Sequence, residues 1–153
     1  MSAARMRPRV NTLAKMVNQP GGMLVEDAVR KAETNLDTIK PVLAEEVEKN
    51  LSALLEALDS AVTRPDKPVL DEAYLRSNQV AGMAGLSGLA PLGQAAFSLC
   101  ELLDKLGVAG RWNAEAVDVH LNAMRLLRRM PEADKQTAHI LQGLREVVAR
   151  ATA

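Results

Sequence analysis

The side chains best suited to nucleophilic attack or metal binding are two histidines and one cysteine. His120 stands among Ala116, Ala123 and Leu127, which recur at helical spacing and form one apolar face. A histidine in such surroundings is more often a buried core residue than a ligand or an acceptor of phosphate. We therefore expect His120 to be structural.

His139 and Cys100 differ from His120 in their neighbours. His139 has Lys135 and Gln142 one turn away, which predicts a solvent-exposed position, and an exposed imidazole is a potential nucleophile. Cys100 falls beside the apolar positions of its predicted helix and is expected to be a small core residue. A lone cysteine cannot form an internal disulfide, and neither histidine has a metal-binding companion at close spacing.

The motifs of conventional enzymes are missing from the sequence. It shows no pair of acidic residues in apolar surroundings, no glycine-rich loop after a strand and no G-x-S-x-G elbow. The sequence therefore predicts a protein that is not an enzyme, with no catalytic residue, no cofactor and no bound metal.

The composition narrows the class of protein. A chain of 153 residues suffices for one domain with a sizeable core. Lys plus Arg and Asp plus Glu balance at 19 each, which argues against a nucleic-acid partner. One Phe, one Tyr and one Trp are few for a β-sandwich and favour a helical bundle. No apolar run is long enough for a membrane span or a secretion signal, so we expect a cytoplasmic protein without a membrane partner.

Residues 1–22 differ in composition from the rest of the chain. All their charges are basic, at Arg5, Arg7, Arg9 and Lys15. Two interpretations stay open: a flexible tail, or a basic arm that docks on a partner or folds on binding. Residues 23–153 are expected to form a single helical domain.

Apolar residues at helical spacing, together with proline and glycine breaks, predict an all-α up-down bundle with a four-helix core and one or two additional helices. Pro41 is expected to separate the first two helices and Gly107 to end the fourth. Asn113 is expected to cap the fifth. The predicted helices are 23–39, 41–62, 69–84, 89–106, 114–130 and 132–150.

Each predicted helix has an apolar stripe. In the third it is made of small side chains, and in the fifth it includes His120. The stripes of the first, third, fifth and sixth helices are Val25, Val29, Ala32, Leu36 and Ile39; Ala73, Ser77, Val80 and Ala84; Ala116, Val119, His120, Ala123, Leu126, Leu127 and Met130; and Thr137, Ile140, Leu141, Leu144 and Val148.

Glycines are concentrated near the end of the third helix, at Gly82, Gly85 and Gly88. Glycine inside a helix costs about 0.5–1 kcal/mol relative to alanine, so this concentration needs a reason. The sequence leaves two open: close packing of another helix, or close approach of a partner protein around Asn78.

The segment Asn78-Gln79-Val80-Ala81-Gly82, followed by Gly88, Leu92, Leu99 and Glu101, resembles the core motif of histidine phosphotransfer (HPt) domains. That family has a helical bundle in which two helices form an antiparallel hairpin with the active histidine. Its motif reads His-x-Leu-Lys-Gly, with a further glycine about six residues on. Asn78 stands in the place of the histidine and Ala81 in that of the lysine.

The resemblance implies a degenerate HPt protein that binds response-regulator receiver domains, or a histidine kinase, without relaying phosphate. Some small alphaproteobacterial chemotaxis-cluster proteins are similar in outline. The residues that the resemblance implies for partner binding are Tyr74, Arg76, Asn78, Gln79, Ala81, Gly82 and Gly85.

Two other functions remain open at this point. An active phosphotransferase would keep the fold and use His139 or His120 as the nucleophile. A structural or oligomerisation module would use the glycines to pack helices, including those of two copies. The sequence leaves open a monomer or a homodimer, and whether residues 23–62 belong to the bundle or to a dimer interface.

Overall fold

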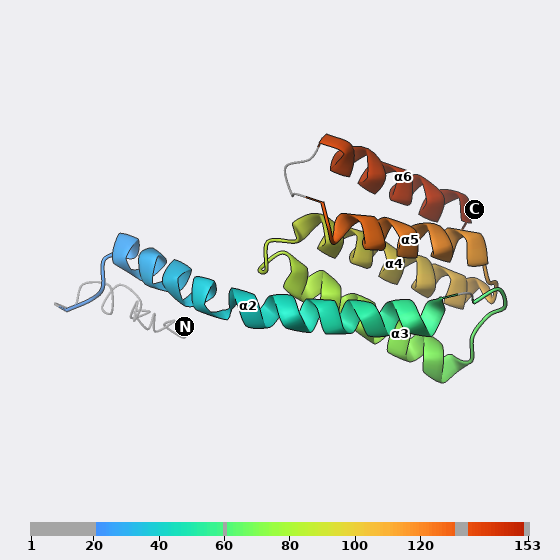
Figure 1. The fold of residues 1–153 in the computed structure, drawn as a ribbon, viewed down its shortest axis with the longest axis horizontal. Coiled ribbons are helices and arrows are strands. Elements are labelled where there is room, and N and C mark those ends of the chain that lie inside the picture. The colour runs from blue at the N-terminus through green and yellow to red at the C-terminus, as the bar shows by residue number, and fades with distance from the viewer. Residues whose placement is uncertain (1–20, 60, 131–134, 152–153) are drawn as a thin grey trace, which may run out of the picture. The chain divides into compact units, whose positions relative to one another are not determined.

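The computed structural model describes residues 21–59, 61–130 and 135–151, and within these ranges all regular structure is helical (Figure 1). The predicted all-α class is therefore confirmed. The chain divides into two units, residues 1–35 and 36–153, and the second contains the bundle. The described helices are α2 Val25–Leu58, α3 Lys67–Ala84, α4 Ala90–Ala109, α5 Ala114–Leu127 and α6 Lys135–Ala151.

The first helix corrects the sequence-based prediction. Residues expected as two helices separated at Pro41 form the single helix α2, with Pro41 inside it. Proline removes one backbone donor and crowds the carbonyl one turn earlier, here that of Asp37. Residues 21–42 are exposed, so water can hydrate the carbonyl that loses its donor. The predicted helix end at Val62 is also four residues late, because α2 ends at Leu58.

The core of the second unit surrounds α4, which contacts α3, α5 and α6. Leucines dominate it, and α2 contributes Val47, Leu51 and Leu54. The predicted small stripe of α3 is buried, and the Ser77 hydroxyl within it donates a 2.8 Å hydrogen bond to the carbonyl oxygen of Ala96 on α4. The small side chains thus let α3 and α4 lie close together as an antiparallel hairpin (Figure 1).

The corner between α3 and α4 forms where the glycines predicted it. Gly88 has a φ of +84°, a conformation that side-chain-bearing residues rarely adopt. Among the helical glycines of the described residues, however, the one whose missing side chain faces close neighbours is Gly93. A Cβ there would lie 3.3 Å from both the Ala81 carbonyl oxygen and the Ala84 Cβ. Gly93, which the sequence did not single out, is therefore the glycine that close helix packing requires.

The junction between α4 and α5 is partly as predicted. The Asn113 side chain accepts a 3.0 Å hydrogen bond from the Ala116 N–H, which confirms the cap. The predicted stop at Gly107 is wrong, because α4 runs to Ala109 and Gly110 supplies the left-handed residue with a φ of +63°. The predicted end of the fifth helix at Met130 is also late, since α5 ends at Leu127.

The buried face of α5 is rotated from the predicted one. Val119 and Leu126 are exposed, whereas Val117, Leu121 and Met124 are buried. The predicted stripe and the buried stripe are both apolar. α5 buries the stripe that contacts both α4 and α6. On α6 the predicted inward residues are buried or partly buried, although residues 132–134 of the predicted helix lie outside the described residues.

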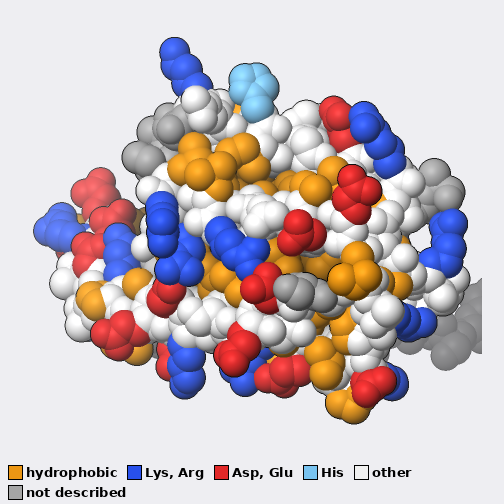
Figure 2. All heavy atoms as spheres, turned by 45° about the vertical axis from the view of Figure 1, so that its right-hand side comes forward, with side chains coloured by type: hydrophobic (Ala, Val, Ile, Leu, Met, Phe, Trp, Pro, Cys, Tyr) orange, Lys and Arg blue, Asp and Glu red, His pale blue; other side chains and the backbone are white. Residues whose placement is uncertain are grey.

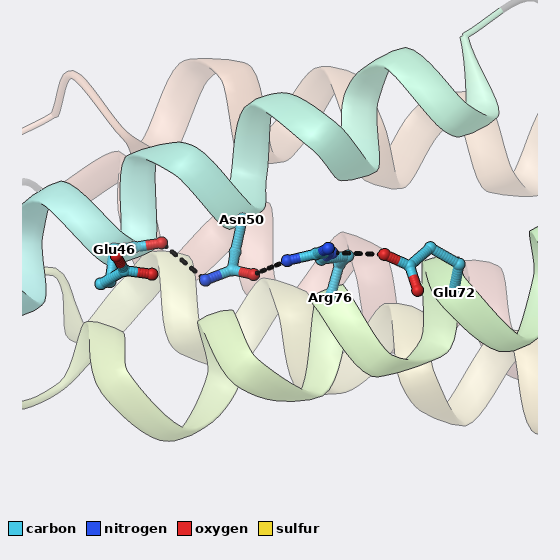
Figure 3. A network of polar contacts seen from close by, with 4 residues as sticks. All are labelled: Glu46, Asn50, Glu72 and Arg76. Carbon is cyan, nitrogen blue, oxygen red and sulfur yellow. Dashed lines mark hydrogen bonds and ion pairs between the residues drawn. The ribbon is translucent and has the colours of Figure 1, made fainter.

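A polar chain connects α2 to α3 (Figure 3). The Arg76 guanidinium donates to the buried Asn50 side-chain oxygen at 2.9 Å and to a Glu72 carboxylate oxygen at 2.7 Å. The Asn50 amide in turn donates to the Glu46 backbone carbonyl at 2.7 Å. Because buried polar groups are costly when unpaired, this chain fixes the register of the two helices.

At the end of the hairpin opposite Gly88, Trp112 connects two loops. Its indole N–H donates a 2.9 Å hydrogen bond to the carbonyl oxygen of Ala61. The bond joins the α2–α3 connection to the α4–α5 connection. Among the described residues, no helix is both long enough and apolar enough to cross a membrane.

Candidate functional site

Five of the seven residues predicted to bind a partner share one face of α3. Tyr74 and Asn78 are four residues apart, the adjacent Ala81 and Gly82 follow one turn later and Gly85 one turn after them, which places all five on one side of the helix. All except the partly buried Ala81 are exposed. We call this set of five the α3 face.

The other two predicted residues lie away from the α3 face. Arg76 is held by Asn50 and Glu72 between α2 and α3 (Figure 3). Gln79 follows one turn later and is partly buried, with a side-chain oxygen that has no partner among the described residues. Arg76 thus stabilises the position of α3. To contact a partner directly, Arg76 would have to break its hydrogen bonds to Asn50 and Glu72.

The space that side chains at Gly82 and Gly85 would occupy is open. A Cβ added at Gly82 or Gly85 would meet nothing within 4 Å. Helix packing within the chain therefore does not explain them, in contrast to Gly93. Gly82 lies inside α3 and therefore carries the cost of a helical glycine, and no neighbour of its missing side chain requires it.

Replacing Gly82 with alanine will therefore stabilise the protein. The new methyl group enters open space, and alanine favours the helix over glycine by about 0.5–1 kcal/mol. Urea unfolding followed by circular dichroism measures the difference. A destabilised variant would mean that Gly82 is packed against something in the folded chain.

A groove adjoins the α3 face where α3, α4 and α6 meet. Its volume is about 520 Å³, and Ala81 and Gly85 of the α3 face form one wall. Phe97 on α4 lines it and is 65% exposed, while Arg145 on α6 also contributes to the lining. The sequence analysis did not single out Phe97. The available signal was that the lone phenylalanine of the chain stands next to Ala96 and two residues before Leu99, which are buried, and so falls off the buried stripe of its helix.

His120 is fully buried between α4 and α5, as predicted. Its Nδ1 lies 2.8 Å from the Ala116 carbonyl oxygen, so that nitrogen must carry the proton. The unprotonated Nε2 then accepts from the Ser98 hydroxyl at 3.0 Å. Burial lowers the pKa of His120, and both ring nitrogens are occupied.

The remaining candidate side chains do not assemble into a reactive cluster. His139 is exposed on α6, as predicted. Cys100 is buried, and that burial raises the pKa of its thiol, which keeps it protonated and unreactive. Within residues 21–59, 61–130 and 135–151, no three His, Cys, Asp or Glu side chains are grouped to hold a metal ion.

On one face of the molecule the charges are mixed rather than segregated. In Figure 2, basic and acidic side chains lie intermingled around hydrophobic patches on this face. This face lacks the continuous positive field that steers nucleic acids.

No protein-family model matches this chain, and neither a curated protein nor a solved structure matches it. Any assignment of function therefore depends on the geometry of the α3 face and its groove.

Proposed function

We propose that this protein is a non-catalytic, HPt-like component of two-component signalling that binds response-regulator receiver domains, or a histidine kinase, without carrying phosphate. The observation that supports it most directly is the open space at Gly82 and Gly85, four and seven residues after the exposed Asn78. A helix without side chains at these positions allows the backbone of another protein to approach closely.

The chemistry of the α3 face is suited to binding and not to phosphotransfer. A phosphohistidine forms on a nucleophilic ring nitrogen, and the Asn78 amide offers no comparable nucleophile. The neighbouring Ala81 supplies no charge to neutralise phosphoryl oxygens. A partner whose active site would accept or donate phosphate could therefore dock here and dissociate unchanged.

Receivers and kinases of this kind exchange phosphate in the cytoplasm, so the proposal includes a cytoplasmic location. A chemotaxis pathway is one setting that fits a receiver-binding protein of this size. The protein would then act as a competitor or adaptor for the partners of an active phosphotransfer protein.

The test is a titration of isotopically labelled protein with receiver domains encoded by the same genome, followed by amide NMR. We expect shifts centred on residues 74–88. Gly82→Arg will abolish binding, because the guanidinium blocks the approach to the α3 face and the open space at Gly82 leaves the fold intact.

Gly143→Arg is the matched control. Gly143 is also an exposed helical glycine at which an added Cβ would meet nothing within 4 Å, but it lies on α6. We expect it to leave receiver binding unchanged. Equal affinity of Gly82→Arg and Gly143→Arg for every receiver that binds would contradict the proposal.

An active phosphotransferase is the second candidate, and the exposed His139 is the residue that favours it. His120 is a poor acceptor, because a receiver cannot reach a fully buried imidazole whose nitrogens are both bonded. Incubation with a phosphorylated receiver or a kinase, then mapping of acid-labile phosphate, separates the two candidates. Label on His139 would replace our proposal with this one.

A further inference from the structure

We propose that the N-terminal part of α2 pairs with the same segment of a second copy as an antiparallel coiled coil. The inference is independent of the proposed function, because it concerns α2 and not the α3 face. It begins from an apolar stripe, which we call the α2 seam: Val25, Val29, Ala32, Leu36, Ile39 and Leu43, of which all but the half-buried Leu43 are exposed.

Most side chains of the α2 seam are exposed. Its large side chains Val25, Val29, Leu36 and Ile39 are 79%, 50%, 38% and 46% exposed. Apolar side chains gathered on one exposed helix face mark an interaction site. Most helical stability in proteins comes from packing of an apolar face, so a partner along the seam would stabilise this segment of α2.

The spacing of the seam identifies the partner as another helix. Successive members are separated by four, three, four, three and four residues, which is the alternation of the a and d positions of a coiled coil. Positions a are then Val29, Leu36 and Leu43. Pro41 falls at an f position, on the opposite side of the helix, so its ring does not interrupt the seam.

The seam is complementary to itself when the second copy runs in the opposite direction. Val29 then faces Ile39 of the second copy, and Ala32 faces its Leu36, so that each of these two layers pairs a smaller side chain with a larger one. Each a position meets a d position, as antiparallel packing requires. One face that pairs with itself makes an isologous interface, the commonest kind in homodimers.

The charges beside the seam favour the antiparallel direction. The e positions are Glu26, Glu33 and Lys40, and in this direction Glu26 of one copy meets Lys40 of the other at both ends. The g positions are Ala28, Asn35 and Val42, which carry no charge. A parallel pair would place e positions beside uncharged g positions and form no ion pairs. The antiparallel pair forms two ion pairs and places Glu33 of one copy beside Glu33 of the other at the centre.

Sedimentation of the full-length chain over a range of concentrations tests the pairing. We expect a dimer that Leu36→Glu converts to a monomer, because the carboxylate would be buried in the centre of the seam. Thr34→Glu adds the same charge at an f position and should leave the dimer intact. Val29→Glu, at a half-exposed site, serves as a second seam variant if Leu36→Glu fails to fold.

Glu33→Gln tests the direction of the pair. It removes the central like-charge contact of the antiparallel arrangement and should tighten the dimer, whereas in a parallel pair it would remove no repulsion. A wild-type chain that stays monomeric at every concentration overturns the inference. The seam would then have a different occupant, such as residues 1–20 or another protein. Equal effects of Leu36→Glu and Thr34→Glu overturn it as well.

Discussion

Replacing Gly93 with leucine will destabilise the bundle. The Cβ alone would lie 3.3 Å from the Ala81 carbonyl oxygen and from the Ala84 Cβ, and neither of these can rotate away. Overpacking of this kind costs about 1–3 kcal/mol, and the better helix propensity of leucine returns less than about 1 kcal/mol. The result is a net loss in the free energy of unfolding, measured by urea denaturation followed by circular dichroism.

Gly107→Leu is the control for this effect. Gly107 lies in the same helix α4, but a Cβ there would meet nothing within 4 Å. Leucine should therefore be neutral or slightly stabilising at Gly107. Two variants with the same stability would show that α3 and α4 do not approach closely at Gly93.

Stability will decrease as the pH is lowered below about 6.5, the ordinary histidine pKa, because of His120. Burial lowers the pKa of His120 in the folded protein, so between the folded and unfolded values the unfolded chain binds more protons. Neutral His120 contributes fully to the free energy of unfolding above the pKa of the unfolded chain, and this contribution is lost as the pH falls through the lower pKa of the folded protein. Urea titrations between about pH 5 and 7.5 measure this slope, above the range in which carboxylates titrate.

Two substitutions assign the slope to its residue. His120→Gln should remove most of it and also lower stability at neutral pH. The amide cannot replace both ring nitrogens, so either the Ser98 hydroxyl or the Ala116 carbonyl oxygen loses its partner, at a cost of about 1–3 kcal/mol. His139→Gln, at an exposed site, should preserve both the slope and the stability. A slope that survives His120→Gln would mean that another group is responsible.

The sequence predicted the parts of the fold that depend on local chemistry. The corner at Gly88 and the cap at Asn113 were found because one residue type satisfies a local backbone requirement. The burial of His120 was found because its apolar neighbours recur on one helix face. The all-α class followed from helical periodicity throughout the chain.

The parts that the sequence did not predict depend on contacts between distant residues. Helical spacing shows that Val25 and Leu36 share a face, but not that this face is exposed. Arg76 was expected to bind a partner protein, and its bond to Asn50 was not predicted because the two residues are 26 positions apart. Gly93 was missed for the same reason, since only the packing of α3 on α4 distinguishes it from Gly82.

The hydrogen bond of Trp112 gives the protein a built-in spectroscopic reporter. Trp112 is the sole tryptophan of the chain, so intrinsic indole fluorescence comes from one place. Its emission will shift to longer wavelength when the indole leaves the Ala61 carbonyl and enters water. Because Trp112 and Gly88 lie at opposite ends of the α3–α4 hairpin, the emission will follow unfolding of the bundle while staying nearly unchanged when a partner binds near Gly85.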